Sequence, residues 1–474
     1  MRWVILTLGS IMSGFVTGQT EPDSGINAPV SVFDSNVYQD LFGTQAMRMV
    51  FNDKAMVQQW LNVEIALATA QAEIGVIPSS AAVAIERAAK IENIDFDELR
   101  QGTNRVGRGI SPLLSQIRAA GDEEVSEYLH LGSTTQDIMD TATVLQIKAG
   151  VNLIRQELVK LTLKFADLAA THKDTVMLAR SNGQDAVPTT FGLHLTTFMM
   201  ELYRHVQRVD ESVSRLQAQI GSTVGTLAPY GDKGFELQER LAQQLGLAVP
   251  IVPWNPSRDS FAEIVQTLGL INATLGRLAT DVNNLGRTQI DEIKEGEGGA
   301  SSTMPQKRNP RASEFIGGFA RMGKMYNSAA LDMMSHSDTR QGSPWILEWS
   351  IVPEAFMVTS ASIDRAQGLL INLIVNKDNM LSNFKAANNF AMSEAVMNAL
   401  AQKIGRGDAY AAVESAIKAA DPKDTLKNVV EKNELINRHF SQQEIDALMI
   451  PANYLGSASK IVERSVSAVR AGLM

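Results

Sequence analysis

Apolar residues recur through the middle of the chain at alternating intervals of four and three positions. In residues 201–220, "ELYRHVQRVDESVSRLQAQI", the apolar positions are Leu202, Val206, Val209, Val213, Leu216 and Ile220. Because an α-helix has about 3.6 residues per turn, this spacing places these side chains on one face, as in helices that pack against other helices. The pattern predicts a helix over the segment.

A second segment, residues 257–303, contains no proline and repeats the same spacing. Its apolar positions are Phe261, Ile264, Leu268, Leu275, Leu278, Val282 and Leu285. If about 30 of these residues are helical, the helix is about 45 Å long. One such helix cannot bury its apolar stripe in a small monomer, so the pattern indicates a helix bundle and contacts with other subunits.

No strand or hairpin pattern of comparable strength is present, so the predicted fold class is all-α. Clusters of glycine and proline divide the chain coarsely. We expect an N-terminal helical domain over residues 31–125, a central long-helix bundle over residues 126–375 and a C-terminal helical domain over residues 376–474. A glycine- and proline-containing loop at residues 296–310 interrupts the central domain.

The chain has 474 residues, of which 45% are hydrophobic, and a net charge of −9. This is an ordinary globular composition, and the charge argues against a disordered or nucleic-acid-binding chain. No cysteine is present, which excludes disulfides and thiolate chemistry. Because no two of the six histidines stand at a zinc-ligand spacing, we expect no metal, and we expect no other cofactor.

The first 19 residues, "MRWVILTLGSIMSGFVTGQ", combine one positive charge with an apolar run and small residues. They fit a secretory signal peptide, which would make the protein secreted or periplasmic. They also fit a non-native extension, with Met12 as the true start. Residues 1–30 are therefore set apart from the helical domains. No later segment approaches the roughly 20 apolar residues of a membrane span, so we expect no membrane partner.

The loop "GASSTMPQKRNPRASE" concentrates chemical groups within a few positions. Ser301 and Ser302 carry hydroxyls, and Lys307 and Asn309 follow them. A hydroxyl beside a lysine in a flexible loop suits proton abstraction next to a carboxylate, whose developing enediolate charge the lysine and asparagine would hold. The alternative is a solvated loop followed by a helix cap.

Two further polar segments are candidates for the same site. Residues 130–142, "HLGSTTQDIMDTA", place hydroxyls before an apolar run, with Asp137 and Asp140 in the first turns of an expected helix. These hydroxyls suit a substrate carboxylate, although an N-cap alone accounts for them. Residues 179–192, "ARSNGQDAVPTTFG", combine amides and hydroxyls and are expected to form a loop.

The stretch "SSTMPQKRNP" resembles the signature of the fumarase/aspartase (fumarate lyase) superfamily, Gly-Ser-Ser-x-Met-Pro-x-Lys-x-Asn-Pro, with Ala300 where glycine is usual. The other two segments are similar to the family's Thr-Ser-x-Asp…Asp-Thr and Arg-Thr-His-x-Gln…Pro-x-Thr-Phe-Gly regions. Within the superfamily, "PWNPSRDSFAEIVQTLGLI" and "GSPWILEWSIVPEAF" resemble 3-carboxy-cis,cis-muconate cycloisomerase, with adenylosuccinate lyase as its neighbour.

The resemblance implies a cytoplasmic, all-α enzyme of three helical domains, whose central bundles form a homotetrameric core with each site built from three subunits. By the motif match, Ser301 is the expected catalytic base and His130 a second candidate catalytic residue. The expected substrate-binding residues are Arg108, Thr134, Thr135, Ser181, Asn182, Gln184, Ser302, Met304, Lys307, Asn309 and Arg340.

Two departures from the adenylosuccinate lyase pattern bear on the substrate. That enzyme usually carries a histidine where Asn182 stands and another near the position of Arg108. Asparagine cannot act as a general acid, and arginine stays protonated. Expelling an amine requires proton delivery, whereas expelling a carboxylate does not. The missing histidines therefore favour a carboxylate, or another weakly basic group, as the leaving group.

The expected function is proton transfer at the carbon α to a carboxylate of a small polycarboxylate, most like 3-carboxy-cis,cis-muconate cycloisomerase. The expected partners are that substrate and further copies of the chain. One alternative is a lyase of the adenylosuccinate type, or another that releases an amine from a succinyl group. The other is a non-catalytic structural protein on the same scaffold, as lens crystallins resemble argininosuccinate lyase.

Overall fold

The computed structural model describes residues 30–473. The 19 residues for which a signal peptide is one expectation lie outside this range. The described part of the chain divides into two units, which meet between Phe42 and Gly43. In the first unit, a short 3-10 helix (Gln39–Leu41) is accompanied by an edge-to-face contact between Phe33 and Phe42, with ring centres 6.0 Å apart.

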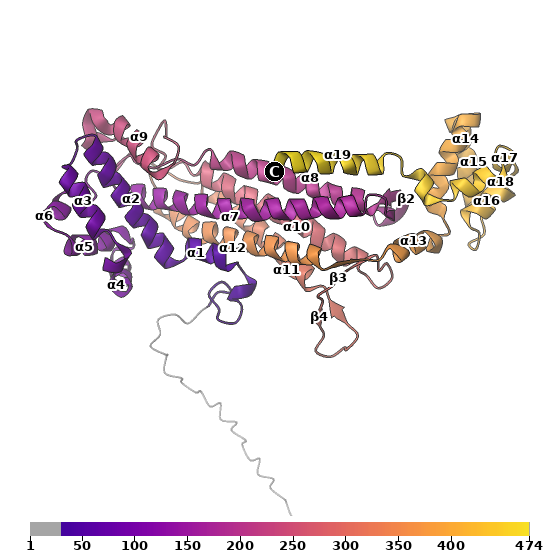
Figure 1. Ribbon diagram of the computed structural model, residues 1–474, viewed down its shortest axis with the longest axis horizontal. Coiled ribbons are helices and arrows are strands. Elements are labelled where there is room, and N and C mark those ends of the chain that lie inside the picture. Colours follow the sequence, from indigo (N-terminus) through magenta and orange to yellow (C-terminus); the bar gives the residue numbers. More distant parts are fainter. Residues whose placement is uncertain (1–29, 474) are drawn as a thin grey trace, which may run out of the picture. The chain divides into compact units, whose positions relative to one another are not determined.

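The second unit is built almost wholly from α-helices, which confirms the predicted all-α fold (Figure 1). The helices are α1 (Gln45–Phe51), α2 (Asp53–Glu73), α3 (Ser79–Ala88), α4 (Phe96–Val106), α5 (Ile110–Ala120), α6 (Glu123–Tyr128), α7 (Thr135–Thr171), α8 (Phe191–Val213), α9 (Gly234–Leu245), α10 (Asp259–Leu285), α11 (Arg311–Asp332), α12 (Gly342–Ile371), α13 (Lys377–Ala386), α14 (Ser393–Ile404), α15 (Arg406–Lys418), α16 (Leu426–Lys432), α17 (Glu434–Asn437), α18 (Gln442–Leu448) and α19 (Ala458–Leu473). Within residues 30–473, no helix is both long and apolar enough to cross a membrane.

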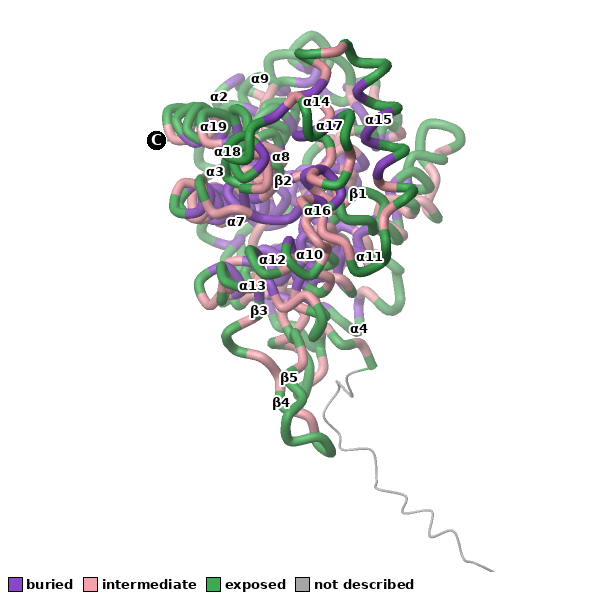
Figure 2. Tube along the Cα trace, turned by 90° about the vertical axis from the view of Figure 1, so that its right-hand side faces the viewer, coloured by how far each residue is buried: buried purple, intermediate pink, exposed green. Residues whose placement is uncertain are grey.

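The long helices α7, α8, α10, α11 and α12 lie side by side as a bundle (Figure 1). The predicted helix in residues 257–303 is α10, whose 27 residues span about 40 Å. Leu268, Leu275 and Val282 of its apolar stripe are buried against the neighbouring helices. Figure 2 shows the same concentration of buried positions along the long helices. The apolar period therefore identified the element that organises the bundle.

The helix predicted over residues 201–220 is shorter than its apolar period. It ends at Val213, although Leu216 and Ile220 remain buried in the segment that follows. The hydroxyls of Ser212 and Ser214 donate to the carbonyls of residues 209 and 211, which competes with continuation of the helix. The apolar spacing marked burial correctly but overran the end of the helix.

Within residues 30–473, the structure contains three two-stranded antiparallel sheets that the sequence did not predict. They are β1 (Val176–Ser181) with β2 (Gln184–Thr190), β3 (Ile293–Glu295) with β6 (Leu373–Val375), and β4 (Gly299–Ala300) with β5 (Arg308–Asn309). The turn between β1 and β2 is Asn182–Gly183, and both residues have positive φ, 53° and 75°. Asn-Gly is the preferred pair for such a hairpin, so this local signal was present in the sequence and was missed.

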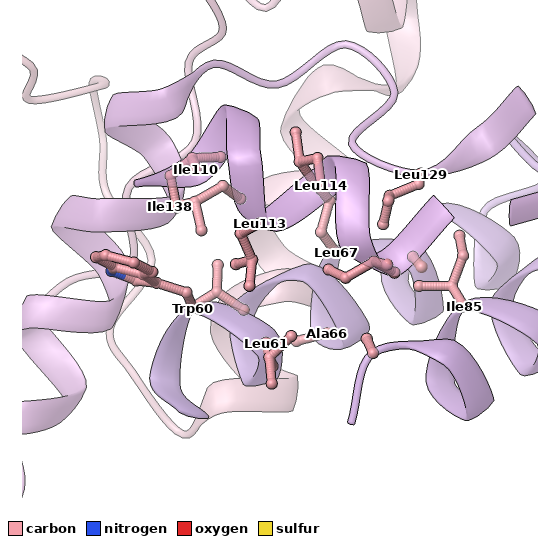
Figure 3. Packing of buried hydrophobic residues seen from close by; sticks show 14 of the residues in the cluster. Trp60, Leu61, Ala66, Leu67, Ile85, Ile110, Leu113, Leu114, Leu129 and Ile138 are labelled. Carbon is pink, nitrogen blue, oxygen red and sulfur yellow. The ribbon is translucent and has the colours of Figure 1, made fainter. Parts of the chain in front are cut away.

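Two separate apolar clusters flank the bundle. One gathers α2, α3 and α5 around side chains such as Leu61, Leu67 and Leu113 (Figure 3). The other joins α14 to α18, with Val396 and Leu400 fully buried. The first cluster fixes α5, which Arg108 precedes, and Leu129, which precedes His130.

Candidate active site

Arg108 projects from a turn that only small neighbours allow. Gly107 has φ 79°, a left-handed conformation that glycine adopts without strain. At Gly109 an added Cβ would lie 2.6 Å from the Trp60 ring, so a side chain there would collide. The half-buried Arg108 guanidinium lies against two indoles that contact each other edge to face, 5.0 Å from the ring centre of Trp345 and 4.9 Å from that of Trp349.

His130 is paired with a buried carboxylate. Its Nδ1 lies 2.6 Å from Oε1 of Glu64 and 3.0 Å from the hydroxyl oxygen of Ser133. Burial lowers the pKa of His130, but the charge of Glu64 and its hydrogen bond outweigh this effect, so the pKa is raised above its usual value. With Nδ1 engaged by Glu64, Nε2 is the ring nitrogen left for a substrate.

Thr134 and Arg340 meet where α7 begins. Thr134 is the N-cap of α7, and its backbone N–H donates to Oδ2 of Asp137 over 3.1 Å. Nη1 of Arg340 donates to the Thr134 hydroxyl over 3.2 Å. Burial, and secondarily the charge of Arg340, lowers the pKa of Arg108. Arg108, His130, Thr134 and Arg340 thus gather at one end of the bundle, with Thr135 as the first residue of α7.

Asp137 is a structural organiser of this end. Its carboxylate accepts the backbone N–H groups of Gly221 (3.0 Å) and Ser222 (2.9 Å) and the side-chain amide of Gln219 (3.3 Å). Burial raises the pKa of Asp137 to about 7, although these hydrogen bonds lower it. The carboxylate ties the segment after α8 to the start of α7. The sequence indicated only a favourable interaction with the helix dipole.

Residues 296–310 form the β4–β5 hairpin, which projects from the bundle and is mostly exposed (Figures 1 and 2). The Ser301 hydroxyl oxygen accepts the backbone N–H groups of Met304 (3.0 Å) and Thr303 (3.4 Å). Hydrogen bonds donated to an oxygen favour its deprotonated form, which a serine base requires. Lys307 and Asn309 line a groove of about 1050 Å³ together with Met304, and Ser302 lies exposed in the same loop.

The β1–β2 turn presents Ser181, Asn182 and Gln184 to solvent. Near this turn the hairpin is held by Arg180, whose guanidinium donates to both oxygens of the buried Glu292, over 2.9 Å and 2.7 Å. Glu292 directly precedes β3, which leads into the β4–β5 hairpin. The two hairpins therefore share one end of the bundle.

The structure does not bring Ser301 together with Thr134 inside one chain. Arg340, which contacts Thr134, stands just before α12, whereas Gly296 at the base of the Ser301 loop donates to the carbonyl of Asn372 over 2.8 Å, just after α12. The 30 residues of α12 span about 45 Å. A hairpin made from residues 296–310 extends about 25 Å at most. The candidate residues thus form two groups at opposite ends of α12.

A buried ionic network of Arg258, Asp140 and Glu348 lies beside Trp345, and the sequence did not predict it. Both guanidinium nitrogens Nη1 and Nη2 of Arg258 donate to Asp140, over 2.8 Å and 3.0 Å, and Nε donates to Glu348 over 2.7 Å. The indole N–H of Trp345 donates to Oδ1 of Asp140 over 3.0 Å. The sequence marked the segments that carry Arg258 and Glu348 only by their resemblance to 3-carboxy-cis,cis-muconate cycloisomerase. Their pairing depends on the tertiary fold.

No metal site emerges from the described side chains. Among residues 30–473, no group of three histidine or carboxylate side chains is placed to hold a metal ion. The chemistry available to the two groups is that of hydroxyls, amides, cations and one histidine–glutamate pair.

Comparisons with known proteins identify the family. A family model described as Lyase matches residues 42–322, and one described as Adenylosuccinate lyase C-terminus matches residues 389–465. Trans-aconitate decarboxylase 1 of Mycosarcoma maydis is 36% identical over 433 residues, which cover 90% of this chain and 88% of the relative. The 3-carboxy-cis,cis-muconate cycloisomerase of Bradyrhizobium diazoefficiens is 36% identical over 432 residues, which cover 90% of this chain and 96% of the relative.

A solved structure agrees with these matches. The crystal structure of 3-carboxy-cis,cis-muconate lactonizing enzyme from Pseudomonas putida superposes with a TM-score of 0.85 and 33% sequence identity, covering 92% of this chain and 99% of that one. Sequence and fold therefore agree along nearly the whole length of both proteins. The chain belongs to the fumarate lyase superfamily of enzymes.

Proposed function

We propose that the protein moves a proton at the carbon α to a carboxylate of a small unsaturated polycarboxylate, in a reaction of the 3-carboxy-cis,cis-muconate cycloisomerase type. Ser301 is the proposed base that removes the α proton when the carboxylate is expelled, because its oxygen already accepts two backbone N–H groups. In the addition direction the same hydroxyl returns a proton to the enediolate at the α carbon. Lys307 and Asn309 hold the adjacent carboxylate and the enediolate charge that develops on it. Ser302 and Met304 line the same loop.

The observation that carries this proposal is the chemistry of the Asn182 and Arg108 positions. Neither side chain can donate a proton to a departing amine at neutral pH. A cycloisomerase adds a carboxylate to an alkene, and the reverse reaction expels that carboxylate, so neither direction requires such an acid. Ser181, Asn182 and Gln184 then serve as hydrogen-bonding groups for the substrate. The names of two relatives, a carboxymuconate cycloisomerase and a trans-aconitate decarboxylase, also denote unsaturated tricarboxylates as substrates.

One observation favours a second candidate function, the release of an amine from a succinyl group. The Glu64 carboxylate keeps the pKa of His130 raised, so this imidazole can carry a proton to a leaving nitrogen. In the cycloisomerase reaction the same charged ring would instead stabilise a substrate carboxylate. His130 therefore remains a proposed catalytic residue in either case.

A panel of substrates, followed by ultraviolet absorbance, separates the two candidates. The panel contains 3-carboxy-cis,cis-muconate, trans-aconitate and adenylosuccinate. We expect turnover of an unsaturated tricarboxylate and little or no cleavage of adenylosuccinate. Efficient cleavage of adenylosuccinate would reverse the ranking and assign the acid role to His130.

We further propose that the protein is a homotetramer in which subunits share their sites. The two groups of candidate residues lie too far apart in one chain to act on one small molecule. A symmetric assembly places the Ser301 loop of one copy beside the Thr134 end of another. The proposed domains, residues 31–125, 126–375 and 376–474, are the units from which this assembly is built.

A complementation experiment tests the shared site. Ser301→Ala should be nearly inactive alone, and Arg340→Met alone should keep at most about a tenth of the wild-type activity at substrate concentrations below KM. In mixed tetramers, about a quarter of the sites combine an intact Ser301 from one chain with an intact Arg340 from another. Co-expression of the two variants should therefore restore about a quarter of the wild-type activity. Sedimentation of the wild type gives the assembly state. No restoration, or a stable and active monomer, would contradict the shared site.

A further inference from the structure

Two arginines at the α7 end have no acidic partner. Within the described part of the chain, neither Arg108 nor Arg340 makes an ion pair. Nη1 of Arg108 donates only to the carbonyl of its neighbour Gly107, over 2.6 Å, and Nη1 of Arg340 only to the Thr134 hydroxyl. A guanidinium has five N–H donors, so most of the donors on both residues are unused.

Arg108 is held in a fixed orientation despite lacking an anion. Trp345 and Trp349 are four residues apart on α12, so they stand on one face of the helix and present their rings to the same guanidinium. The two rings pack edge to face, and a cation in contact with both gains an attraction at each ring. Its N–H groups lie in the guanidinium plane and remain free to bind a carboxylate in two-point fashion.

The indole pair that contacts Arg108 is itself anchored in the interior. Trp345 is buried, and its indole N–H donates to Asp140, whose two oxygens already accept from Arg258, which also pairs with Glu348. Asp140 is therefore not available as a partner for Arg108. The network fixes the ring that orients Arg108 while leaving the guanidinium without an anion of its own.

The surroundings of the two guanidiniums favour an anion. Arg340 is close enough that its charge adds to burial in lowering the pKa of Arg108. An added Cβ at Gly342, the first residue of α12, would lie 3.4 Å from Nη2 of Arg108. The start of a 30-residue helix therefore adds its partial positive charge beside two like charges. A bound carboxylate would relieve this concentration of positive charge.

We propose that Arg108, with Arg340, binds a carboxylate that takes no part in the bond changes and so selects tricarboxylates over dicarboxylates. This inference rests on the proposed function, in which Lys307 and Asn309 hold one carboxylate and a second adds to the alkene. A dicarboxylate leaves the arginine pair without a partner, which costs about 10- to 100-fold in affinity. Trp345 and Trp349 are positioning residues that act through Arg108.

Calorimetry with unreactive ligands tests the assignment without relying on turnover. The ligands are propane-1,2,3-tricarboxylate and glutarate, which has the same terminal carboxylates but lacks the central one. We expect the assembled wild type to prefer the tricarboxylate. Arg108→Met should weaken tricarboxylate binding about 10- to 100-fold and change glutarate binding little. Equal losses for both ligands, or no loss, would overturn the proposal.

Matched variants separate positioning from general disruption. Arg105→Met removes an exposed arginine three residues before Arg108 and should bind both ligands like the wild type. Trp349 is 40% exposed, so Trp349→Leu should fold while losing part of the tricarboxylate preference. Trp349→Phe should restore that preference, because it keeps an aromatic face. A leucine variant with full preference would remove Trp349 from the assignment.

The two proposals fail in different ways. If Arg108 discriminates between the ligands but the substrate panel finds no turnover of any polycarboxylate, the proposed reaction is wrong and the carboxylate site stands. If a tricarboxylate is turned over but Arg108→Met lowers tricarboxylate and glutarate binding equally, the reaction stands and the selective role of Arg108 is wrong.

Discussion

Replacing Ser301 with alanine should lower turnover by at least about 100-fold while the substrate still binds. The substitution removes the oxygen that accepts the backbone N–H groups of Met304 and Thr303, and with it the proposed group that gives a proton to the α carbon in cyclisation and takes it back in the reverse reaction. Lys307 and Asn309 remain, so affinity should change much less than turnover. The measurement is steady-state kinetics together with calorimetric binding of the tricarboxylate analogue.

The control for this experiment is Thr303→Ala. It lies in the same exposed loop and keeps the backbone N–H that donates to Ser301. Its turnover should stay within a few-fold of wild type, because no reacting group is lost. Near-normal turnover in Ser301→Ala would remove the serine from the mechanism. An equal loss in both variants would show that the loop is sensitive to any change.

Arg258→Met should destabilise the folded protein by about 3–5 kcal/mol, because it leaves Asp140 and Glu348 buried without their cation. Denaturant unfolding at a fixed protein concentration measures the loss. The control is Arg215→Met, which breaks an exposed ion pair with Glu263 and should cost about 1 kcal/mol or less. Similar losses for the two variants would contradict a special role for the buried network.

The loss in Arg258→Met should also depend on pH. Burial raises the pKa of Glu348 to about 7 even though the charge of Arg258 lowers it. Removing Arg258 takes away the charge that lowers the pKa of Glu348, so the folded-state pKa of Glu348 rises further above its unfolded value. A group raised in this way loses its contribution to stability as the pH rises through the folded-state value. The free energy of unfolding of the variant should therefore be closer to that of wild type at pH 5 than at pH 8. A difference that does not change with pH would contradict this expectation.

The sequence predicted the features that depend on short-range patterns. The stripe from Phe261 to Leu285 identified α10, and the hydroxyls before an apolar run marked the start of α7 at Thr135. The same method missed the end of α8, because an apolar period reports burial and does not stop where hydroxyls compete for carbonyls. The Asn182–Gly183 hairpin was missed although its turn residues are typical.

The site residues divide in the same way. Ser301, Lys307 and Asn309 were proposed together because they share one loop, and the structure keeps them in one hairpin. The contact of Arg108 with two indoles could not be predicted, since Trp345 and Trp349 lie more than 200 residues away along the chain. The contact between Trp345 and Asp140 likewise joins positions 205 apart. Such pairs follow from helix packing, which apolar spacing alone does not determine.

The position of the proton gained from solvent tests most directly whether Ser301 moves a proton at the carbon α to a carboxylate. The protein is incubated with 3-carboxy-cis,cis-muconate in D2O and the product is analysed by nuclear magnetic resonance. We expect wild type to form a product with a single deuterium at the carbon α to a carboxylate, and Ser301→Ala to form little of this product. A product formed without deuterium at that carbon, or formed equally fast by Ser301→Ala, would contradict the proposed role of Ser301.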